Sequence, residues 1–218
     1  AVALGIFKAP VRILKIGAMF SSLATLVLVL FLIYSFDPLG ETQFVQRLPW
    51  IQNAGVSYFV GVDYLSIVIL TLIALLMPPL YLYMYNEKRK GYWYNMMVLQ
   101  TGVTGAALSL DLVLFYLFWE TMLLPIFIMI GKYGSGMRQY NSMKIVLMTV
   151  LGSMSMLFSI LYIGYVYFET NAVWSFAFND LNAIEFDAKT SIWLAAGFLL
   201  AFAIKIPLVG FHTWMAPA

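Results

Sequence analysis

The stretch FYLFWETMLLPIF, residues 115–127, carries one glutamate at the centre of an apolar run. No other charged residue lies between Asp111 and Lys132, and Pro125 follows Glu120 after five residues. A charged side chain at the centre of a lipid bilayer costs roughly 2.5–3.5 kcal/mol on insertion scales and more in simulations. Such a group is expected to be paired, protonated, or both at different moments, so Glu120 is the first candidate functional residue.

The composition of the whole chain predicts a membrane protein. Of its 218 residues, 63% are hydrophobic and 10% are charged, whereas soluble domains average about 45–50% apolar and about 25% charged residues. We therefore expect lipid to be the solvent and expect no nucleic-acid partner. The absence of cysteine and the single histidine exclude disulfides, thiolate metal sites and histidine clusters for zinc.

Apolar runs long enough to span a bilayer, about 17–25 residues, occur repeatedly along the chain. Because a spanning segment must satisfy its own backbone polar groups, we interpret these runs as helices. The predicted fold class is all-α, a polytopic transmembrane helix bundle forming one domain over residues 1–218, with outer loops at 37–63 and 169–189. The predicted spans are residues 16–36, 64–85, 92–110, 112–130, 141–168 and 190–209.

Both ends of the chain have the pattern of a fragment. The segment AVALGIF before Lys8 is too short to span a bilayer, has no initiator Met and has the composition of the last turns of a helix. The C-terminal FHTWMAPA stops without a polar tail. We expect a longer protein at both ends.

The basic residues of the loops predict how the bundle is oriented. Two basic residues, Arg47 and Lys189, fall on one side together with seven acidic residues, and eight basic residues fall on the other. We expect the strongly basic side to face the cytoplasm or the mitochondrial matrix. Its basic residues are Lys8, Arg12, Lys15, Lys88, Arg89, Lys90, Lys132 and Arg138.

The first outer loop contains a hairpin signal. The turn residues NAG at 53–55 precede VSYFVGV, a run of β-branched and aromatic residues. This pattern predicts a small hairpin on the outer surface. An irregular loop is the alternative.

Glu120 has a functional and a structural interpretation. An intramembrane acid is by default a functional group, in which movement of a nearby cation would switch the proton on and off. Hydrogen bonding to a neighbouring helix is the structural alternative. Pro125 lacks an N–H and its ring displaces the carbonyl of Thr121, which predicts a kink one residue after Glu120.

Lys205 lies in a second interrupted segment, LLAFAIKIPLVGFHTW. Pro207 frees the carbonyl of Ala203, and a lysine at the C-terminal end of a half-helix is favoured by the backbone dipole. Helices broken at membrane depth mark ion sites in transporters. The alternative is a lysine that extends to the membrane interface.

Two further residues are weaker candidates for proton transfer. Lys144 lies one turn into its predicted helix on the basic side, a position that favours extension to the interface. His212 carries an imidazole, a side chain that commonly shuttles protons, and a hydrogen bond to a backbone carbonyl of the broken segment is the alternative role for it.

Several of these motifs resemble those of one family, the antiporter-like membrane subunits of respiratory complex I, NADH:quinone oxidoreductase. FYLFWETMLLPIFIMIGKYG resembles the family's Trp-Glu-x-x-x-x-Pro helix, and GFLLAFAIKIPLVGFHTW its Phe-x-Lys-x-Pro-x-x-x-x-His-x-Trp helix. VGVDYLSIVILTL at 60–72 resembles the start of an early helix, with Tyr64 where the family has glycine. AVWSFAFNDL at 172–181 is similar to an outer loop of the subunit M type, which is subunit 4 in mitochondria.

The resemblance implies a function for the candidate residues. Glu120 and Lys205 match the family's essential glutamate and its partner lysine, and Lys144 and His212, as further candidates for proton translocation, match positions that are often lysine and histidine. It implies the first part of an antiporter-like inverted-repeat fold with broken helices at Pro125 and Pro207, and proton translocation driven by quinone reduction elsewhere. No cofactor is expected in this chain, because NADH, FMN, Fe–S clusters and quinone belong to partner subunits.

The resemblance also implies partners and a location. These are other membrane subunits of complex I, including neighbouring antiporter-like subunits, in a bacterial plasma membrane or a mitochondrial inner membrane. One departure is HTWMAPA at 212–218, where the family has an acidic residue that this sequence lacks.

Two other functions remain open. A cation/proton antiporter subunit of the multisubunit sodium-exchange type, or of a membrane-bound hydrogenase, would share both helices. A non-conducting structural membrane subunit is the second alternative.

Overall fold

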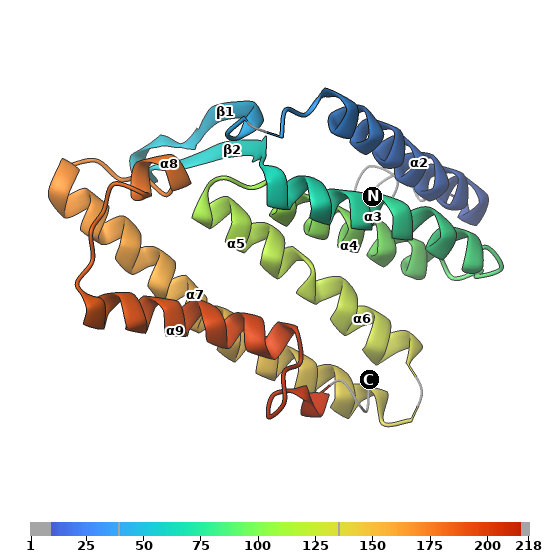
Figure 1. Cartoon of the computed structure of the whole chain (residues 1–218). Coiled ribbons are helices and arrows are strands. Elements are labelled where there is room, and N and C mark those ends of the chain that lie inside the picture. Colours follow the sequence, from blue (N-terminus) through green and yellow to red (C-terminus); the bar gives the residue numbers. More distant parts are fainter. Residues whose placement is uncertain (1–9, 39, 135, 215–218) are drawn as a thin grey trace.

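The computed structural model describes residues 10–38, 40–134 and 136–214, which form a helix bundle with one β-hairpin (Figure 1). The predicted all-α membrane fold class is confirmed. Lys8, the AVALGIF segment and the final MAPA of the C-terminal motif lie outside the described residues. The helices are α2 (Val11–Ser35), α3 (Tyr64–Tyr83), α4 (Lys90–Leu108), α5 (Leu112–Thr121), α6 (Leu123–Tyr133), α7 (Arg138–Asn171), α8 (Phe178–Leu181) and α9 (Ala188–Lys205).

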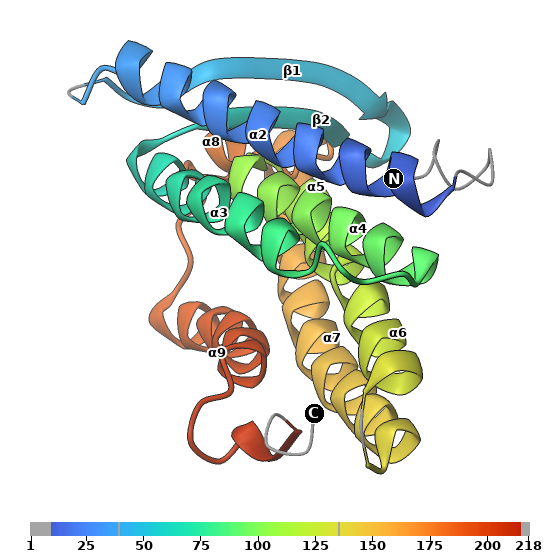
Figure 2. The same cartoon turned by 90° about the vertical axis from the view of Figure 1, so that its right-hand side faces the viewer.

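Five stretches of the described residues are helical, long and apolar enough to cross a membrane, with α5 and α6 forming one such stretch. The helix α4 has the length of a span but is less hydrophobic. It contacts α2, α3, α5 and α6 (Figure 2), and its Asn95 and Gln100 are buried. Neighbouring helices cover much of α4 in place of lipid, so it tolerates polar side chains that a lipid-facing helix would not.

The hairpin consists of β1 (Gln43–Ile51) and β2 (Val56–Val62), which pair antiparallel with Arg47 opposite Phe59. A short 3₁₀ turn, Gln52–Ala54, joins the strands, and Gly55 follows it with φ +67°. Residues with a side chain rarely adopt that backbone conformation, so glycine is favoured where the chain reverses. Of the two alternatives for this loop, the hairpin is the one observed.

The hairpin lies against the end of the bundle where α4 turns into α5 (Figure 1). In that turn, the Leu110 N–H donates to the Phe59 carbonyl at 2.8 Å, and the Leu112 N–H donates to the Phe176 carbonyl at 2.9 Å. The Phe178 N–H donates back to the Leu110 carbonyl at 2.9 Å. The two polar loops and the tight turn are therefore one hydrogen-bonded layer from which α5 begins.

Asp111 joins this layer to the helix. Its Oδ1 accepts from the N–H groups of Val113 and Leu114 at 3.0 and 3.1 Å, which caps α5. Its Oδ2 accepts from the N–H and the hydroxyl of Ser57 in β2 at 3.0 and 3.1 Å. The side chain is 0% exposed. A buried carboxylate is stable because its oxygens are hydrogen-bonded, and Asp111 therefore fixes the start of α5 against the hairpin.

A salt bridge at the same end of the bundle joins the hairpin to the loop at 169–189. Arg47 Nη2 lies 2.9 Å from Asp180 Oδ2, which also accepts from the Ser175 hydroxyl at 2.5 Å. Burial of the Asp180 carboxyl acts to raise its pKa, but these hydrogen bonds and the Arg47 charge outweigh it and hold the pKa below its ordinary value of 3.8. The ionised form of Asp180 therefore stabilises the layer formed by the hairpin and the loop at 169–189.

Asp111→Ala is expected to destabilise the protein by roughly 2 kcal/mol or more, because it removes the helix cap and leaves the buried Ser57 donors without an acceptor. The measurement is the thermal unfolding midpoint of the solubilised complex, with Glu41→Ala as the control. Glu41 is an exposed acid in the same outer region. Equal midpoints for the two variants would contradict the role of Asp111.

Acid is expected to loosen the contact between the hairpin and the second outer loop. Because the pKa of Asp180 is depressed on folding, its stabilising effect is present above the ordinary value of 3.8 and is lost as the pH falls through the folded value. Hydrogen-exchange protection of residues 175–181, corrected for the intrinsic rate at each pH, should decrease once the pH is lower than the folded-state pKa of Asp180. Arg47→Gln should lose protection at a higher pH than the unchanged protein, and an identical pH profile would refute this prediction.

Candidate functional site

Glu120 lies where the fourth predicted span is interrupted. The helix α5 ends at Thr121 and α6 begins at Leu123 (Figure 1). Pro125 is buried in the first turn of α6, where a residue without an N–H removes the hydrogen bond to the Thr121 carbonyl. The helix is thus interrupted near the predicted kink, and the half-buried Glu120 lies in the last turn of α5 beside weakened backbone hydrogen bonding.

Lys205 is the last residue of α9 and reaches α5 at Trp119. Its Nζ donates to the Trp119 carbonyl at 3.4 Å and lies 4.8 Å from the centre of the Trp119 ring. The ring attracts the cation through its negative face, and the helix end places Lys205 where the backbone dipole favours positive charge. Lys205 is therefore held by Trp119, the residue that directly precedes Glu120.

Rings from both helices surround this contact. Trp119 meets Phe202 of α9 edge to face at 5.4 Å between ring centres and lies 5.7 Å from Phe115 of its own helix. Aromatic pairs in these geometries hold each other in place beyond the area that they bury. The cluster fixes the position of the Trp119 carbonyl relative to Lys205.

The Lys205 and Glu120 charges interact electrostatically, but they form no direct ion pair in the described part of the chain. The ammonium is held by a carbonyl and a ring rather than by the carboxylate. The two groups are therefore neighbours whose direct contact requires Lys205 to change its hydrogen bond.

The chain folds back directly after Lys205. The Leu208 N–H donates to the Ala203 carbonyl at 2.9 Å, which satisfies the group that Pro207 leaves without its helical partner. Trp214 Nε1 donates to the Ile204 carbonyl at 3.0 Å. The last predicted span ran to residue 209, whereas α9 ends at Lys205 and a 3₁₀ turn, His212–Trp214, follows.

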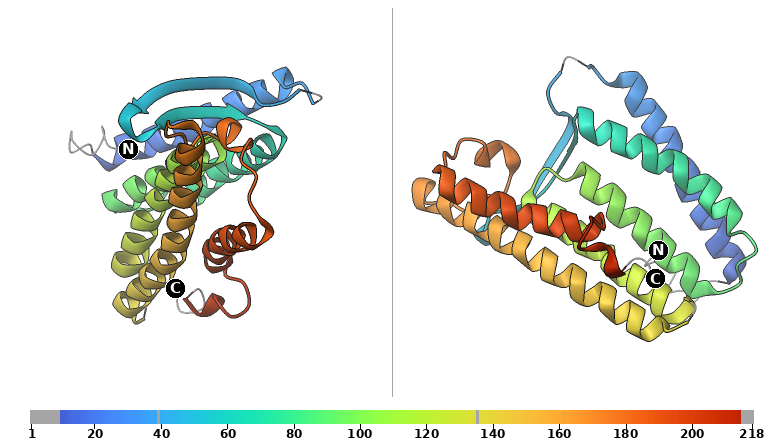
Figure 3. Two further views of the ribbon diagram at one scale, coloured as in Figure 1. Left: turned by 90° about the vertical axis from the view of Figure 1, so that its left-hand side faces the viewer. Right: turned by 60° about the horizontal axis from the view of Figure 1, so that its bottom comes forward.

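Small residues set the distance between α9 and α7, which lie side by side (Figure 3). The Ser155 hydroxyl donates to the Gly197 carbonyl at 2.9 Å, and the Ser159 hydroxyl donates to the Leu194 carbonyl at 3.3 Å. At Gly152, an added Cβ would lie 2.8 Å from the Ile204 side chain. Glycine and serine let helix backbones approach closely in a membrane, and this contact positions α9 and hence Lys205.

Lys144 and His212 lie on other elements than Lys205 and Trp119. Lys144 is half-buried in the second turn of α7. His212 is exposed, and its Nδ1 accepts from the Gly210 N–H at 3.3 Å. This bond joins His212 to the backbone of the turn, although the partner is an N–H and not the carbonyl expected. In the described part of the chain, no three His, Asp or Glu side chains come together as a metal site.

Trp119 is the residue whose role the sequence did not reveal. It belongs to the Trp-Glu motif, but no local pattern shows that its carbonyl and ring receive a lysine 86 positions later. One feature of the sequence pointed to an unusual partner for Lys205: no acidic residue lies near it in the chain. That absence predicts some other acceptor for the ammonium without identifying it.

Comparison with known proteins assigns the chain to a family. Residues 109–218, half of the chain, match the model described as NADH:quinone oxidoreductase/Mrp antiporter, TM. The chain belongs to this family. The matching region contains the broken helix α5–α6, the paired helices α7 and α9, and both Glu120 and Lys205. The resemblance predicted from the motifs is confirmed.

Individual relatives agree with the family. The NADH-quinone oxidoreductase subunit M of Rickettsia conorii is 33% identical over 208 residues, which cover 92% of this chain and 41% of that protein. A chain of respiratory complex I from Thermus thermophilus superposes with a TM-score of 0.80 at 27% identity, over 92% of this chain and 41% of the other. The chain therefore spans about two fifths of the length of these proteins.

The fold extends to a second kind of complex. A chain of the Mrp complex from Dietzia sp. DQ12-45-1b superposes with a TM-score of 0.80 at 22% identity, over 99% of this chain and 40% of the other. At that identity, the likeness shows the fold alone.

Gly197→Val is expected to destabilise the protein by about 1–3 kcal/mol, because a side chain there forces apart two packed helices. A Cβ at Gly197 would lie 2.1 Å from Ser159 Oγ and 2.9 Å from the Ser155 carbonyl oxygen. The control is Ala196→Val on the exposed face of α9. Thermal unfolding of the solubilised complex gives the readout, and equal midpoints would show that α7 does not set the position of α9.

Proposed function

We propose that this chain is the N-terminal part of an antiporter-like membrane subunit of NADH:quinone oxidoreductase and takes part in proton translocation. The observation that supports this most is Lys205, held by the carbonyl and ring of Trp119 next to Glu120. A base and an acid lie here at two helix interruptions, and the rings of Trp119 and Phe202 pack beside the lysine. Such an arrangement favours a proton relay over a purely structural contact.

The relay works by electrostatics. When the Lys205 ammonium lies close to Glu120, the positive charge favours the ionised carboxylate. When the ammonium moves away, Glu120 takes up a proton and becomes neutral. Lys205 then releases its own proton to the next acceptor and becomes a neutral amine. Charge is conserved at each step, and quinone reduction in the rest of the complex supplies the free energy.

The helix interruptions make this exchange accessible. The turn at Met122 and the turn after Lys205 leave α5 and α9 free to adjust without breaking a continuous hydrogen-bond ladder. Pro125 and Pro207 support these turns. Lys144 on α7 and His212 in the final turn are the further groups proposed to carry protons towards and away from the pair.

The assembly supplies what this chain lacks. In the proposed complex, NADH, FMN, Fe–S clusters and quinone are bound by partner subunits, and this chain binds other membrane subunits and lipid. The exposed apolar side chains of α2 fit such surroundings, for example Phe20 at 73% exposed. The membrane is a bacterial plasma membrane or a mitochondrial inner membrane, with the strongly basic loops on the cytoplasmic or matrix side.

Glu120→Gln and Lys205→Met are expected to lower proton pumping per NADH oxidised at least about tenfold, because each removes a group that exchanges a proton. Both are tested in the assembled complex in vesicles, with a pH-sensitive dye and NADH oxidation followed together. Lys132→Met is the matched control, since Lys132 is an exposed lysine at the end of α6.

Unchanged pumping in Glu120→Gln would refute the relay. A loss of assembled complex in Lys205→Met, with normal pumping by the complex that does assemble, would assign this lysine a structural role. Because arginine stays charged, retention of pumping by Lys205→Arg would refute the release of a proton by this residue, whereas loss of pumping would support it.

A second candidate is a cation/proton antiporter subunit, favoured by the family description and by the shared fold of the Mrp chain. Two measurements separate it from the first. Purification of the complex through this chain brings flavin and Fe–S clusters if the subunit belongs to the oxidoreductase. Uptake of radioactive sodium coupled to a proton gradient, without these centres, would support the exchanger.

A further inference from the structure

The end of α5 forms a binding position for a cation, built from one carbonyl and one ring. Because α5 ends at Thr121 and Met122 lies outside both helices, the carbonyls of the last turn have no partner within α5 and carry the negative end of its dipole. The Trp119 carbonyl is one of these, and it accepts the hydrogen bond of Lys205 Nζ at 3.4 Å. The centre of the Trp119 ring lies 4.8 Å from the same nitrogen. One residue thus presents both an oxygen and a π face to the ammonium.

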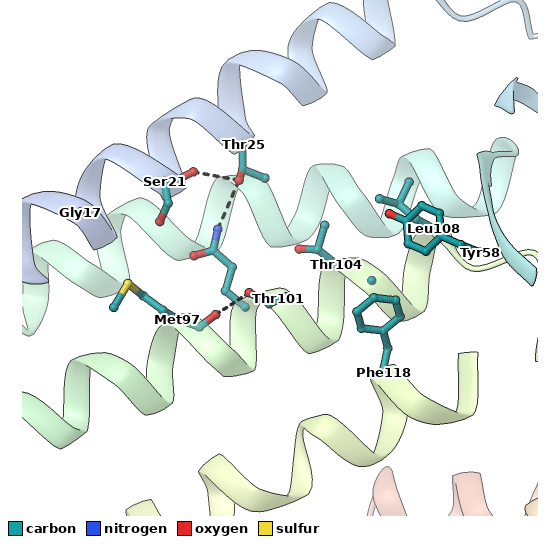
Figure 4. A pocket seen from close by; sticks show the side chains of 11 residues that line it. Gly17, Ser21, Thr25, Tyr58, Met97, Thr101, Thr104, Leu108 and Phe118 are labelled. Atoms are coloured by element: carbon teal, nitrogen blue, oxygen red, sulfur yellow. Dashed lines mark hydrogen bonds between the residues drawn. The ribbon is translucent and has the colours of Figure 1, made fainter. Parts of the chain in front are cut away.

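The packing of α5 against α4 turns Trp119 towards α9. Phe118, the preceding residue, points to α4 and lines the groove between α2 and α4 (Figure 4). A Cβ on Gly105 of α4 would lie 2.4 Å from the Phe118 ring, and so close a contact leaves α5 little freedom to rotate about its axis. Successive residues of a helix point about 100° apart. Trp119 therefore faces another side of α5, where its ring meets Phe202 of α9.

A second position for the ammonium is the carboxylate of Glu120, the next residue of the same helix. The charges of Lys205 and Glu120 interact, although the described residues contain no direct ion pair between the two. The lysine ammonium lies at the end of a flexible stem of four carbons. It therefore has acceptors on two adjacent residues, and the structure places it on Trp119.

The two positions suit different protonation states of the Glu120 carboxyl group. At the carboxylate, the ammonium and an ionised Glu120 attract each other, and both charges are removed from water. At Trp119, a neutral carbonyl and a neutral ring stabilise the cation, which leaves Glu120 without a counter-charge. A carboxylate without a counter-charge in apolar surroundings is unstable and takes up a proton. The location of the ammonium and the protonation of Glu120 are thus linked.

We propose that Trp119 is a positioning residue of the relay, whose carbonyl and ring hold the Lys205 ammonium while Glu120 is protonated. This inference rests on the proposed function and specifies where the ammonium lies after it leaves Glu120. In the order of the relay, this is the step after Glu120 takes up its proton and before Lys205 releases one, and Trp119 itself transfers no proton. Without the ring, the ammonium favours the carboxylate and keeps Glu120 ionised.

Fluorinated tryptophans test the ring with almost no change in its shape. Fluorine withdraws electrons from the ring and weakens the attraction of its face for a cation. Tryptophan with one, two, three or four fluorines is incorporated at position 119 alone, and proton pumping per NADH oxidised is measured in the assembled complex in vesicles. We expect pumping per NADH to fall with each fluorine, by roughly threefold or more over the series, because the ammonium then remains at Glu120.

The same series at Trp174 is the matched control. Trp174 is half-buried against the same apolar cluster as Trp119, and its ring stacks on Phe168 and Phe176 at 4.9 and 6.2 Å between ring centres. In the part of the chain that the structure describes, no Lys or Arg side chain lies over the Trp174 ring. Fluorination there should leave pumping unchanged. A flat or rising series at position 119, or an equal decline at both positions, would overturn the proposal.

Glu120→Gln, measured beside the fluorine series, separates failure of this inference from failure of the relay. If Glu120→Gln pumps normally, the relay itself is refuted, and the role of Trp119 with it. If Glu120→Gln loses pumping while fluorination at position 119 has no effect, the relay stands and the role of Trp119 is refuted. A graded fall along the series, together with the loss in Glu120→Gln, supports both.

Discussion

The buried carboxylate of Asp111 is the interaction on which the arrangement of this chain depends. It caps α5 and accepts two hydrogen bonds from Ser57 of the hairpin. Because α5 begins at this residue, Asp111 also determines how deep in the bundle Glu120 lies. The layer formed by the hairpin, the tight turn and the loop at 169–189 is therefore a frame that sets the depth of the candidate site.

The second constraint is the absence of water around the spanning segments. Each helix must satisfy its own backbone groups, so an interruption persists where other contacts replace the lost bonds. After α9, the Leu208 N–H and the Trp214 indole provide them. The same constraint explains why Lys205 rests on a carbonyl and a ring: these groups stabilise a cation without the strong attachment of a direct ion pair.

The sequence by itself determined the class of the fold and the position of its interruptions. Hydropathy and length indicated spanning helices, because lipid permits few other structures. Pro125 and Pro207 marked the ends of two half-helices, because proline lacks the N–H that a helix needs. The turn NAG with a following β-branched run left a hairpin and an irregular loop as alternatives. The motifs around Glu120 and Lys205 were sufficient to identify the family.

The tertiary structure alone decided which side chains meet. The partner of Lys205 is Trp119, and that of Asp111 is Ser57, 86 and 54 positions apart in the chain. Such pairs depend on the rotation of each helix about its axis and on its distance from its neighbours, which glycine and serine residues set where α7 meets α9. Local periodicity shows that a helix forms but fixes neither quantity. The direction of the Trp119 ring towards α9 was hidden for the same reason, since it follows from the packing of Phe118 against α4.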